Sequence, residues 1–168
     1  IDNNIKKCPT DNILLNKKIT HFICQENIYV NLAWNIGVQL SKNENICIIN
    51  DDVCVDFKIF YKVLDFLNTI TNVGVTCISP GDKNFYQPMF IDGTININPW
   101  VDPPSDKIHG SRFGFGTLFF IKKQNWVDIP LELRVFFGDD WVFNTQQIMG
   151  RINYVISNCF YYTPSAQT

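Results

Sequence analysis

Short apolar runs alternate with helical segments along this chain, and this alternation constrains the fold more than any other feature. The runs at 19–26, 45–50 and 73–79 have the length and apolar content of buried strands. Apolar residues at helical spacing fill the intervals, at 29–42 and directly after Asp56. Strands joined in this order by helices predict an α/β fold with a mostly parallel central sheet flanked by helices.

Each helical segment has an apolar face that we expect to pack on this sheet. Asp56 is placed to cap the second segment, whose apolar residues follow the i, i+3, i+4 spacing of one helix face. The predicted faces comprise Val30, Ala33, Trp34, Gly37 and Leu40 in the first segment, and Phe57, Phe60, Val63, Leu64 and Leu67 in the second. We expect the second face to belong to the core.

The second half of the chain continues the same alternation. "FGTLFFI" (115–121) predicts a buried strand, and "INYVIS" (152–157) predicts a last strand. Between them, the "GDD" that begins at Gly138 opens a helix of about 11 residues, which Gly150 ends. No internal repeat or second domain is evident.

The segment between Pro80 and Arg112 differs from the rest because it is rich in Pro, Gly and Asp. Asp92-Gly93 is a hairpin turn signal and predicts a small antiparallel excursion from the sheet. The remainder predicts a long surface loop, and long loops in compact domains are commonly functional. We expect this loop to order over a bound ligand.

Composition fits one globular domain. The chain has 168 residues, of which 46% are hydrophobic and 18% charged. The net charge of −2, without a basic excess, argues against a nucleic-acid partner. No apolar run reaches the roughly 18–20 residues of a transmembrane helix, so we expect no transmembrane segment in this chain.

Six cysteines are present, without a CxxC pair or the spacing of a zinc site. Cys24, Cys47 and Cys77 fall in apolar, strand-like runs, where cysteine behaves as a small hydrophobic residue. We therefore expect reduced thiols and a cytoplasmic location, or one on the cytosolic face of a membrane.

Two pairs of adjacent carboxylates stand out. Asp51-Asp52 follow Asn50 at the end of a buried run, and Asp139-Asp140 open the last helix. In a parallel α/β sheet, ligands bind outside the carboxyl ends of the strands. Oxygen ligands there suit Mg²⁺ or Mn²⁺, with a substrate phosphate completing the coordination shell. The structural alternatives are a turn at "NDD" and carboxylates that complement a helix dipole.

The order of these motifs resembles the nucleotide-sugar glycosyltransferases of the GT-A fold, particularly glycosyltransferase family 2. "NLAWNIGVQLSKNENICIINDDV" is similar to the family's Asn-x-Gly helix leading into an acidic strand end. "GFGTLFFIKKQNWVDI" is similar to its Gly-rich acceptor-side strand, and "FFGDDWVFN" to its Glu-Asp motif. "IDNN" resembles the end of its second strand. The resemblance covers residues 1–168 as a single domain, in which the family's first strand is missing. That strand either lies upstream or has been lost, and a chain without it would bind a donor poorly.

The resemblance implies a metal-dependent, inverting hexosyltransferase, which moves a sugar from a nucleotide-diphosphate donor to a hydroxyl of a glycan or glycoprotein. Asn50-Asp51-Asp52 takes the place of the family's DXD motif. Asp52 and Asn50 are then the implied ligands of Mn²⁺ or Mg²⁺, and Asp51 the implied donor contact. Asp140 is the implied catalytic base, with Asp139 as the second candidate.

Five further side chains are candidates for the site. Asn35 is a candidate donor contact, with a place on the helix surface as the alternative. Arg112 suits the donor phosphates, and His109 is a candidate metal ligand, with a solvated loop histidine as the alternative. Trp100 and Trp141 offer ring faces on which an acceptor sugar can stack.

The chain departs from the family pattern in two motifs. Asn50 is neutral where the DXD motif has an acid, so Asp52 should carry more of the metal binding. "NCFYYTPS" has Tyr161-Tyr162 where many relatives have a histidine, so a histidine ligand is not expected there.

Two other functions fit the same motifs. A nucleotidyltransferase of similar architecture would also place metal-binding carboxylates at strand ends. A non-catalytic glycosyltransferase-like domain, for carbohydrate binding or assembly, would keep the fold without the reaction. Binding of Mn²⁺ with a nucleoside diphosphate, and hydrolysis of a sugar donor, separate these alternatives.

Overall fold

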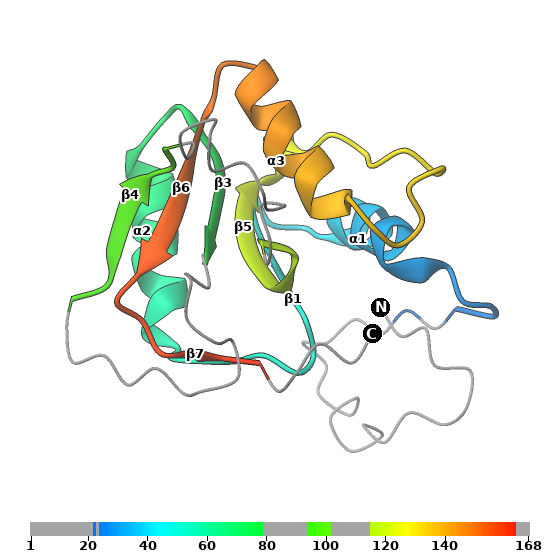
Figure 1. The fold of residues 1–168 in the computed structure, drawn as a ribbon, viewed down its shortest axis with the longest axis horizontal. Coiled ribbons are helices and arrows are strands. Elements are labelled where there is room, and N and C mark those ends of the chain that lie inside the picture. Colours follow the sequence, from blue (N-terminus) through cyan, green and yellow to red (C-terminus); the bar gives the residue numbers. More distant parts are fainter. Residues whose placement is uncertain (1–21, 23, 79–93, 102–114, 164–168) are drawn as a thin grey trace, which may run out of the picture. The chain divides into compact units, whose positions relative to one another are not determined.

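The computed structural model describes residues 22, 24–78, 94–101 and 115–163 (Figure 1). The chain divides into two compact units, each of which is described separately. The smaller unit contains the described residues up to Ser41 together with Asp128–Gly138. The larger unit contains the described residues of Lys42–Val127 and those from Asp139 onward. Within these ranges, no helix has the length and apolar content needed to cross a bilayer.

The smaller unit contains helix α1 (Tyr29–Leu40) and the loop 128–138. The predicted helix at 29–42 is confirmed, but the predicted apolar face is not the buried one. Its most buried residues are Asn31, Asn35 and Val38, whereas Leu40 is 49% exposed. The described residues of the predicted strand at 19–26 form no strand.

The larger unit is built on a five-stranded sheet (Figure 1). Its strands in spatial order are β1 (Asn45–Ile49), β5 (Leu118–Lys122), β3 (Val73–Ile78), β6 (Ile152–Ser157) and β4 (Asn96–Pro99). β5 is antiparallel to both of its neighbours, β3 and β6 pair in parallel, and β4 is antiparallel to β6. The α/β prediction is therefore confirmed, but the described sheet is mixed rather than mostly parallel.

β1, β3 and β6 nevertheless run in the same direction. We call the edge of the sheet where these three strands end the carboxyl edge, and the opposite one the amino edge. β5 runs the other way between β1 and β3, so it begins at the carboxyl edge. The 3₁₀ turn η2 (Phe115–Thr117), which leads into β5, consequently lies at this edge.

Helix α2 (Lys58–Thr69) covers one face of the sheet and buries Ile59, Val63 and Leu67. The ring of Phe60 packs edge-on against Phe120 of β5, with the centroids 5.7 Å apart. Phe66 packs in the same way against Tyr154 of β6, at 4.8 Å. This face is the apolar core of the larger unit.

The start of α2 confirms one prediction and corrects another. Asp56 caps the helix, because its Oδ1 accepts a hydrogen bond of 2.9 Å from the Lys58 N–H. Phe57 and Leu64, which we expected in the core, are 77% and 44% exposed. Successive helix residues point about 100° apart, and the face that meets the sheet is centred on Ile59 instead.

Helix α3 (Gly138–Ile148) covers the opposite face. It has the predicted length of 11 residues and ends before Gly150, whose φ of +72° suits a glycine after a helix. Asn153 of β6 donates a 2.9 Å hydrogen bond to the Phe143 carbonyl of α3. Since neighbouring strand residues point to opposite faces, Asn153 faces α3 while Tyr154 faces α2.

A short second ribbon pairs β2 (Cys54–Val55) with β7 (Tyr161–Tyr162) in antiparallel register. It brings the chain that follows Asp52 beside the end of the described chain.

The predicted hairpin turn at 92–93 and most of the predicted loop at 80–112 lie outside the described residues.

Thr76 provides a test of the core. It is fully buried in β3, and within the described part of the chain its hydroxyl has no hydrogen-bond partner. Its register neighbours Phe120 and Tyr154 belong to the core that α2 covers. Thr76→Val keeps the shape and removes the unsatisfied hydroxyl, so we expect it to stabilise the fold by about 1 kcal/mol. Thermal unfolding measures this.

The matched control is Thr69→Val on the surface of α2, where the hydroxyl donates to the Asp65 carbonyl at 2.8 Å. This bond is exposed, so we expect only a small change in melting temperature. A lower melting temperature for Thr76→Val than for wild type would contradict the arrangement of this core.

Candidate functional site

The turn η2 connects the two acidic segments at the carboxyl edge. The Asn50 N–H, just after β1, donates a 2.9 Å hydrogen bond to the Thr117 carbonyl. The neighbouring Gly116 N–H donates to Oδ2 of Asp139 at 3.2 Å. Residues far apart in the sequence, at the end of β1 and the start of α3, therefore meet on a three-residue turn.

The two carboxylate oxygens of Asp52 have different surroundings. Its Oδ2 accepts a hydrogen bond of 3.2 Å from the Thr163 hydroxyl. Its Oδ1 is buried and has no hydrogen-bond partner among the described residues. Asp51, by contrast, is exposed in the turn that follows β1. An oxygen with free lone pairs, removed from water, is placed to receive a ligand from outside the described chain.

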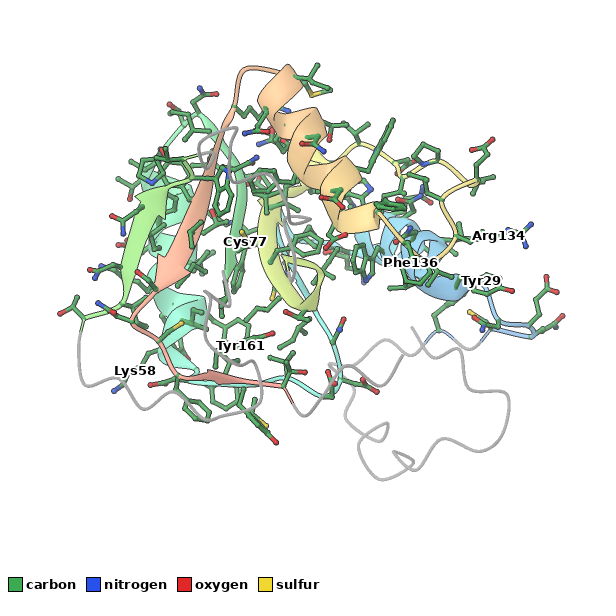
Figure 2. The ribbon with its side chains drawn as sticks, viewed as in Figure 1. Tyr29, Lys58, Cys77, Arg134, Phe136 and Tyr161 are labelled. Atoms are coloured by element: carbon green, nitrogen blue, oxygen red, sulfur yellow. The ribbon has the colours of Figure 1, made fainter. Side chains whose placement is uncertain are left out.

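Tyr161 joins β7 to this edge. Its side chain extends from the ribbon toward the sheet, and its phenol O–H donates a short hydrogen bond to the hydroxyl of Thr117 (Figure 2). Burial raises the pKa of the Tyr161 phenol, and the negative charge of Asp52 raises it further, although the bond to Thr117 opposes both. The phenol is therefore a neutral donor at physiological pH.

The start of α3 is anchored through Asp139. Besides the bond from Gly116, the Asp139 charge raises the pKa of Cys77, near the end of β3, so its carboxylate lies by the carboxyl edge. Asp140 and Trp141 follow in the first turn and are half-buried. The Trp141 indole N–H is buried without an acceptor among the described residues.

The donor set at this edge suits one kind of cation site. The described residues contain no group of three or more His, Cys, Asp or Glu side chains that could hold a metal. An all-protein cage is therefore not present in this part of the chain. Mg²⁺ and Mn²⁺ also bind through one or two carboxylates, with substrate phosphates and water completing the shell. The unsatisfied Oδ1 of Asp52 fits that second mode.

Asn35 has a structural role in the smaller unit. It is 4% exposed, and its side chain pairs with the backbone of Ile129 through two hydrogen bonds, of 2.9 and 3.0 Å. The expected place on the helix surface is wrong, because the side chain is buried. Its amide groups are engaged in holding the loop 128–138, which leaves the donor-binding role without support from this geometry.

Asn31 holds the same loop one helical turn earlier. Its Nδ2 donates to the carbonyls of Leu133 and Phe136, at 2.7 and 3.2 Å. Phe137 has a φ of +63°, which is unusual for an aromatic residue. A side chain at Gly138 would collide with the Asn31 amide, since a Cβ would lie 2.0 Å from its Oδ1. The backbone that leads into Gly138 is thus tightly defined within the smaller unit.

Trp100 is not brought to this edge. Trp100 follows β4, and its N–H donates to the Asn153 carbonyl near the start of β6, so it lies at the amino edge. Its ring packs edge-on against Phe143 of α3 at 5.6 Å. His109 and Arg112 lie outside the described residues.

Three of the cysteine thiols are unreactive at neutral pH because burial raises their pKa. The five in the described chain are free, as predicted, and Cys8 lies outside the described residues. Burial raises the pKa of Cys47 to about 12 and that of Cys159 to about 11, and burial also raises that of Cys77. These three thiols are protonated at neutral pH and are poor nucleophiles and poor metal ligands.

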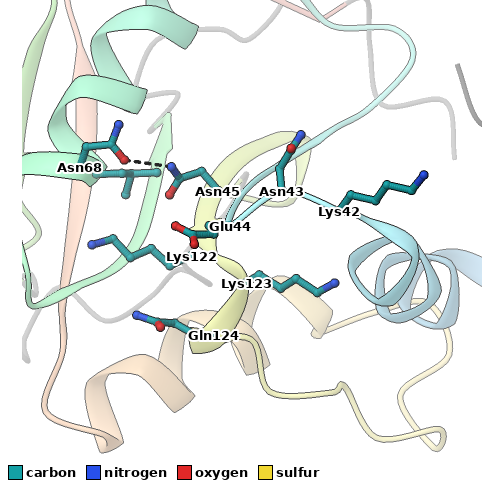
Figure 3. A pocket seen from close by; sticks show the side chains of 9 residues that line it. Lys42, Asn43, Glu44, Asn45, Asn68, Lys122, Lys123 and Gln124 are labelled. Carbon is teal, nitrogen blue, oxygen red and sulfur yellow. Dashed lines mark hydrogen bonds between the residues drawn. The ribbon is translucent and has the colours of Figure 1, made fainter. Parts of the chain in front are cut away.

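A cavity of about 530 Å³ lies at the amino edge instead (Figure 3). Its lining residues are Lys42, Asn43, Glu44, Asn45, Leu67, Asn68, Lys122, Lys123 and Gln124. The Lys122 and Lys123 side chains point in opposite directions, and the Lys122 ammonium is bonded to the Ile70 carbonyl at 3.1 Å. This cavity has no converging charges and is remote from both acidic segments, so we do not assign it to the donor.

Thr117, Tyr161 and Thr163 contact the candidate site and were not predicted from the sequence as site residues. The threonines have no distinctive spacing in the sequence that would indicate a site. The one available signal was the position of Tyr161, in the stretch where the family pattern has a histidine.

Comparisons with protein-family models, curated proteins and solved structures found no match to this chain.

The role of Asn35 can be tested by stability. Asn35→Leu leaves the N–H and carbonyl of Ile129 buried without partners, at a cost of about 1–3 kcal/mol for each group. We expect a clear fall in the free energy of unfolding, measured by urea denaturation. Gln39→Ala is the control, because its 3.5 Å contact with Asp128 is exposed. Equal stability of both variants would contradict the structural role.

Proposed function

We propose that this protein is a metal-dependent glycosyltransferase, which transfers a hexosyl group from a nucleotide-diphosphate sugar to a hydroxyl of a glycan or glycoprotein, with inversion. One observation carries the proposal: η2 bonds to the backbone of Asn50 and to the carboxylate of Asp139. The two acidic segments that resemble the GT-A motifs therefore share the carboxyl edge. Ligands of α/β sheets bind at such edges.

In this proposal Asp52 holds Mn²⁺ or Mg²⁺ through the unsatisfied Oδ1, with Asn50 as a second contact. The cation, when bound, neutralises charge on the leaving diphosphate. Asp51 and Arg112 contact the donor, and His109 is a further candidate ligand. Because Asp52 is the only carboxylate of the segment that is partly buried, it is the stronger of the two acidic candidates for this role.

Asp140 is the proposed catalytic base. The acceptor hydroxyl oxygen attacks the anomeric carbon, the bond from that carbon to the diphosphate oxygen breaks, and the hydroxyl proton passes to the carboxylate. A single displacement of this kind inverts the anomeric centre. Asp139 is bonded to the Gly116 N–H, which supports an orienting role for it. The buried Trp141 N–H, adjacent to Asp140, is available to donate a hydrogen bond to a hydroxyl of the acceptor sugar.

The five free cysteines are what a reducing compartment would maintain, and they support the cytosolic location that we propose.

The metal assignment is tested with Asp52→Ala. We expect the variant to lose Mn²⁺-dependent binding of nucleoside diphosphates while its melting temperature stays close to that of wild type, because Asp52 accepts one hydrogen bond within the described chain. Calorimetry with a panel of nucleoside diphosphates, with and without Mn²⁺, measures this. Asp65→Ala removes an exposed carboxylate on α2 and serves as the control. If Asp52→Ala binds nucleoside diphosphates with Mn²⁺ as tightly as wild type does, the assignment of the metal to Asp52 is wrong.

The base is tested by comparing two isosteric changes, Asp140→Asn and Asp139→Asn. We expect Asp140→Asn to lower sugar transfer by at least roughly 10²-fold, the scale of general-base loss, with little change in donor binding. Asp139→Asn should lower turnover less and cost some stability, since it weakens the bond to Gly116 and the charge at the helix start. The opposite ranking would exchange their roles.

If neither change affects transfer, the proposed mechanism at this helix is wrong. If the protein binds Mn²⁺ and a nucleoside diphosphate but neither transfers nor hydrolyses any sugar, the non-catalytic alternative holds. Transfer of a nucleotidyl group to a sugar phosphate would identify a nucleotidyltransferase.

A further inference from the structure

The residue after β7 is hydrogen-bonded to the acidic turn after β1. Thr163 is 6% exposed, and its hydroxyl donates to Oδ2 of Asp52 at 3.2 Å. Two neighbouring contacts fix the place of Thr163. Tyr161 and Tyr162 pair with β2, and the Tyr161 phenol is bonded to Thr117. The hydroxyl is therefore presented to Asp52 from an anchored segment rather than from a free chain end.

This hydrogen bond determines how the Asp52 carboxylate is turned. A carboxylate on a flexible side chain rotates about its terminal bond, so its two oxygens are equivalent unless one is bound. Here Oδ2 is bound by Thr163, and Oδ1 is buried without a partner. A buried oxygen without a donor costs free energy. The structure thus distinguishes the two oxygens, because one is hydrogen-bonded and the other is buried without a donor among the described residues.

We propose that Thr163 is a positioning residue, which orients the Asp52 carboxylate so that Oδ1 is presented to a divalent cation. The inference rests on the metal-dependent part of the proposed function. Groups that hydrogen-bond to a ligating carboxylate orient it, and their loss typically weakens metal affinity about 10–100-fold. Thr163 orients the Asp52 carboxylate through a neutral hydroxyl donor. A lysine or arginine in its place would instead cancel the charge that attracts the cation.

The test compares three variants of Thr163 in the full chain. Thr163→Val removes the hydroxyl at constant shape, Thr163→Ser keeps the hydroxyl and removes the methyl group, and Thr163→Ala removes the hydroxyl in a smaller side chain in case valine does not fit. The probe is Mn²⁺ alone, and its free concentration is followed by electron paramagnetic resonance. Thr76→Val is the matched control, because it removes a buried hydroxyl that makes no hydrogen bond.

We expect Thr163→Val and Thr163→Ala to raise the dissociation constant for Mn²⁺ by about 10-fold or more. Thr163→Ser and Thr76→Val should stay within about 2-fold of wild type, since neither removes the donor to Asp52. A merely structural role would lower the melting temperature without this separation between the serine and valine variants. Folded Thr163→Val or Thr163→Ala protein that binds Mn²⁺ as wild type does would overturn the inference.

The experiment distinguishes a failure of the positioning role from a failure of the proposed glycosyltransferase function. If the hydroxyl-free variants lose Mn²⁺ affinity but wild type transfers no sugar from any nucleotide donor, the positioning role stands and the glycosyltransferase proposal fails. If wild type transfers sugar with Mn²⁺ and the valine variant binds the metal equally well, only the positioning role fails. If wild type binds no Mn²⁺, both the inference and the metal-dependent mechanism fail.

Discussion

The antiparallel placement of β5 between β1 and β3 is the constraint on which the candidate site depends. A parallel strand in this position would begin at the amino edge, and its preceding turn would lie away from the carboxylates. Because β5 runs the other way, η2 arrives where β1 ends. Backbone groups of this turn then bond to the segment after β1 and to Asp139 at the start of α3. The direction of one strand thus determines which residues become neighbours.

Local periodicity predicted the elements well but not their pairing. The last helix, its glycine stop and the last strand have the predicted positions because capping and turn residues act within a few positions. Strand direction depends on long-range contacts that leave no local pattern. The face of α1 was mistaken for a related reason. Asn31 and Asn35 are buried because they satisfy backbone groups of the loop 128–138, and hydrophobicity alone ranks such residues as exposed.

The candidate site was predictable to the extent that it consists of carboxylates. Asp52 and Asp139 stood out because adjacent acids at element ends are uncommon and have a chemical reason to be there. Thr163 and Thr117 had no such signal. A threonine in a turn or just after a strand is ordinary, and the partner of Thr163 is known only once β2 and β7 are paired. Carboxylates therefore indicate a site from the sequence, whereas the hydroxyl groups that orient them emerge from the fold.

The surroundings of Asp52 favour binding over stability. Two neutral hydroxyl groups interact with it: that of Thr163, which donates to it, and the Tyr161 phenol, whose raised pKa keeps it protonated. A chain selected for stability alone would give a partly buried carboxylate a full set of donors, or replace it with a neutral side chain. Here one oxygen has a donor and the other has none. In the proposed function, a bound cation would supply the missing partner of Oδ1, so the free energy lost by leaving this oxygen unsatisfied would be recovered on binding.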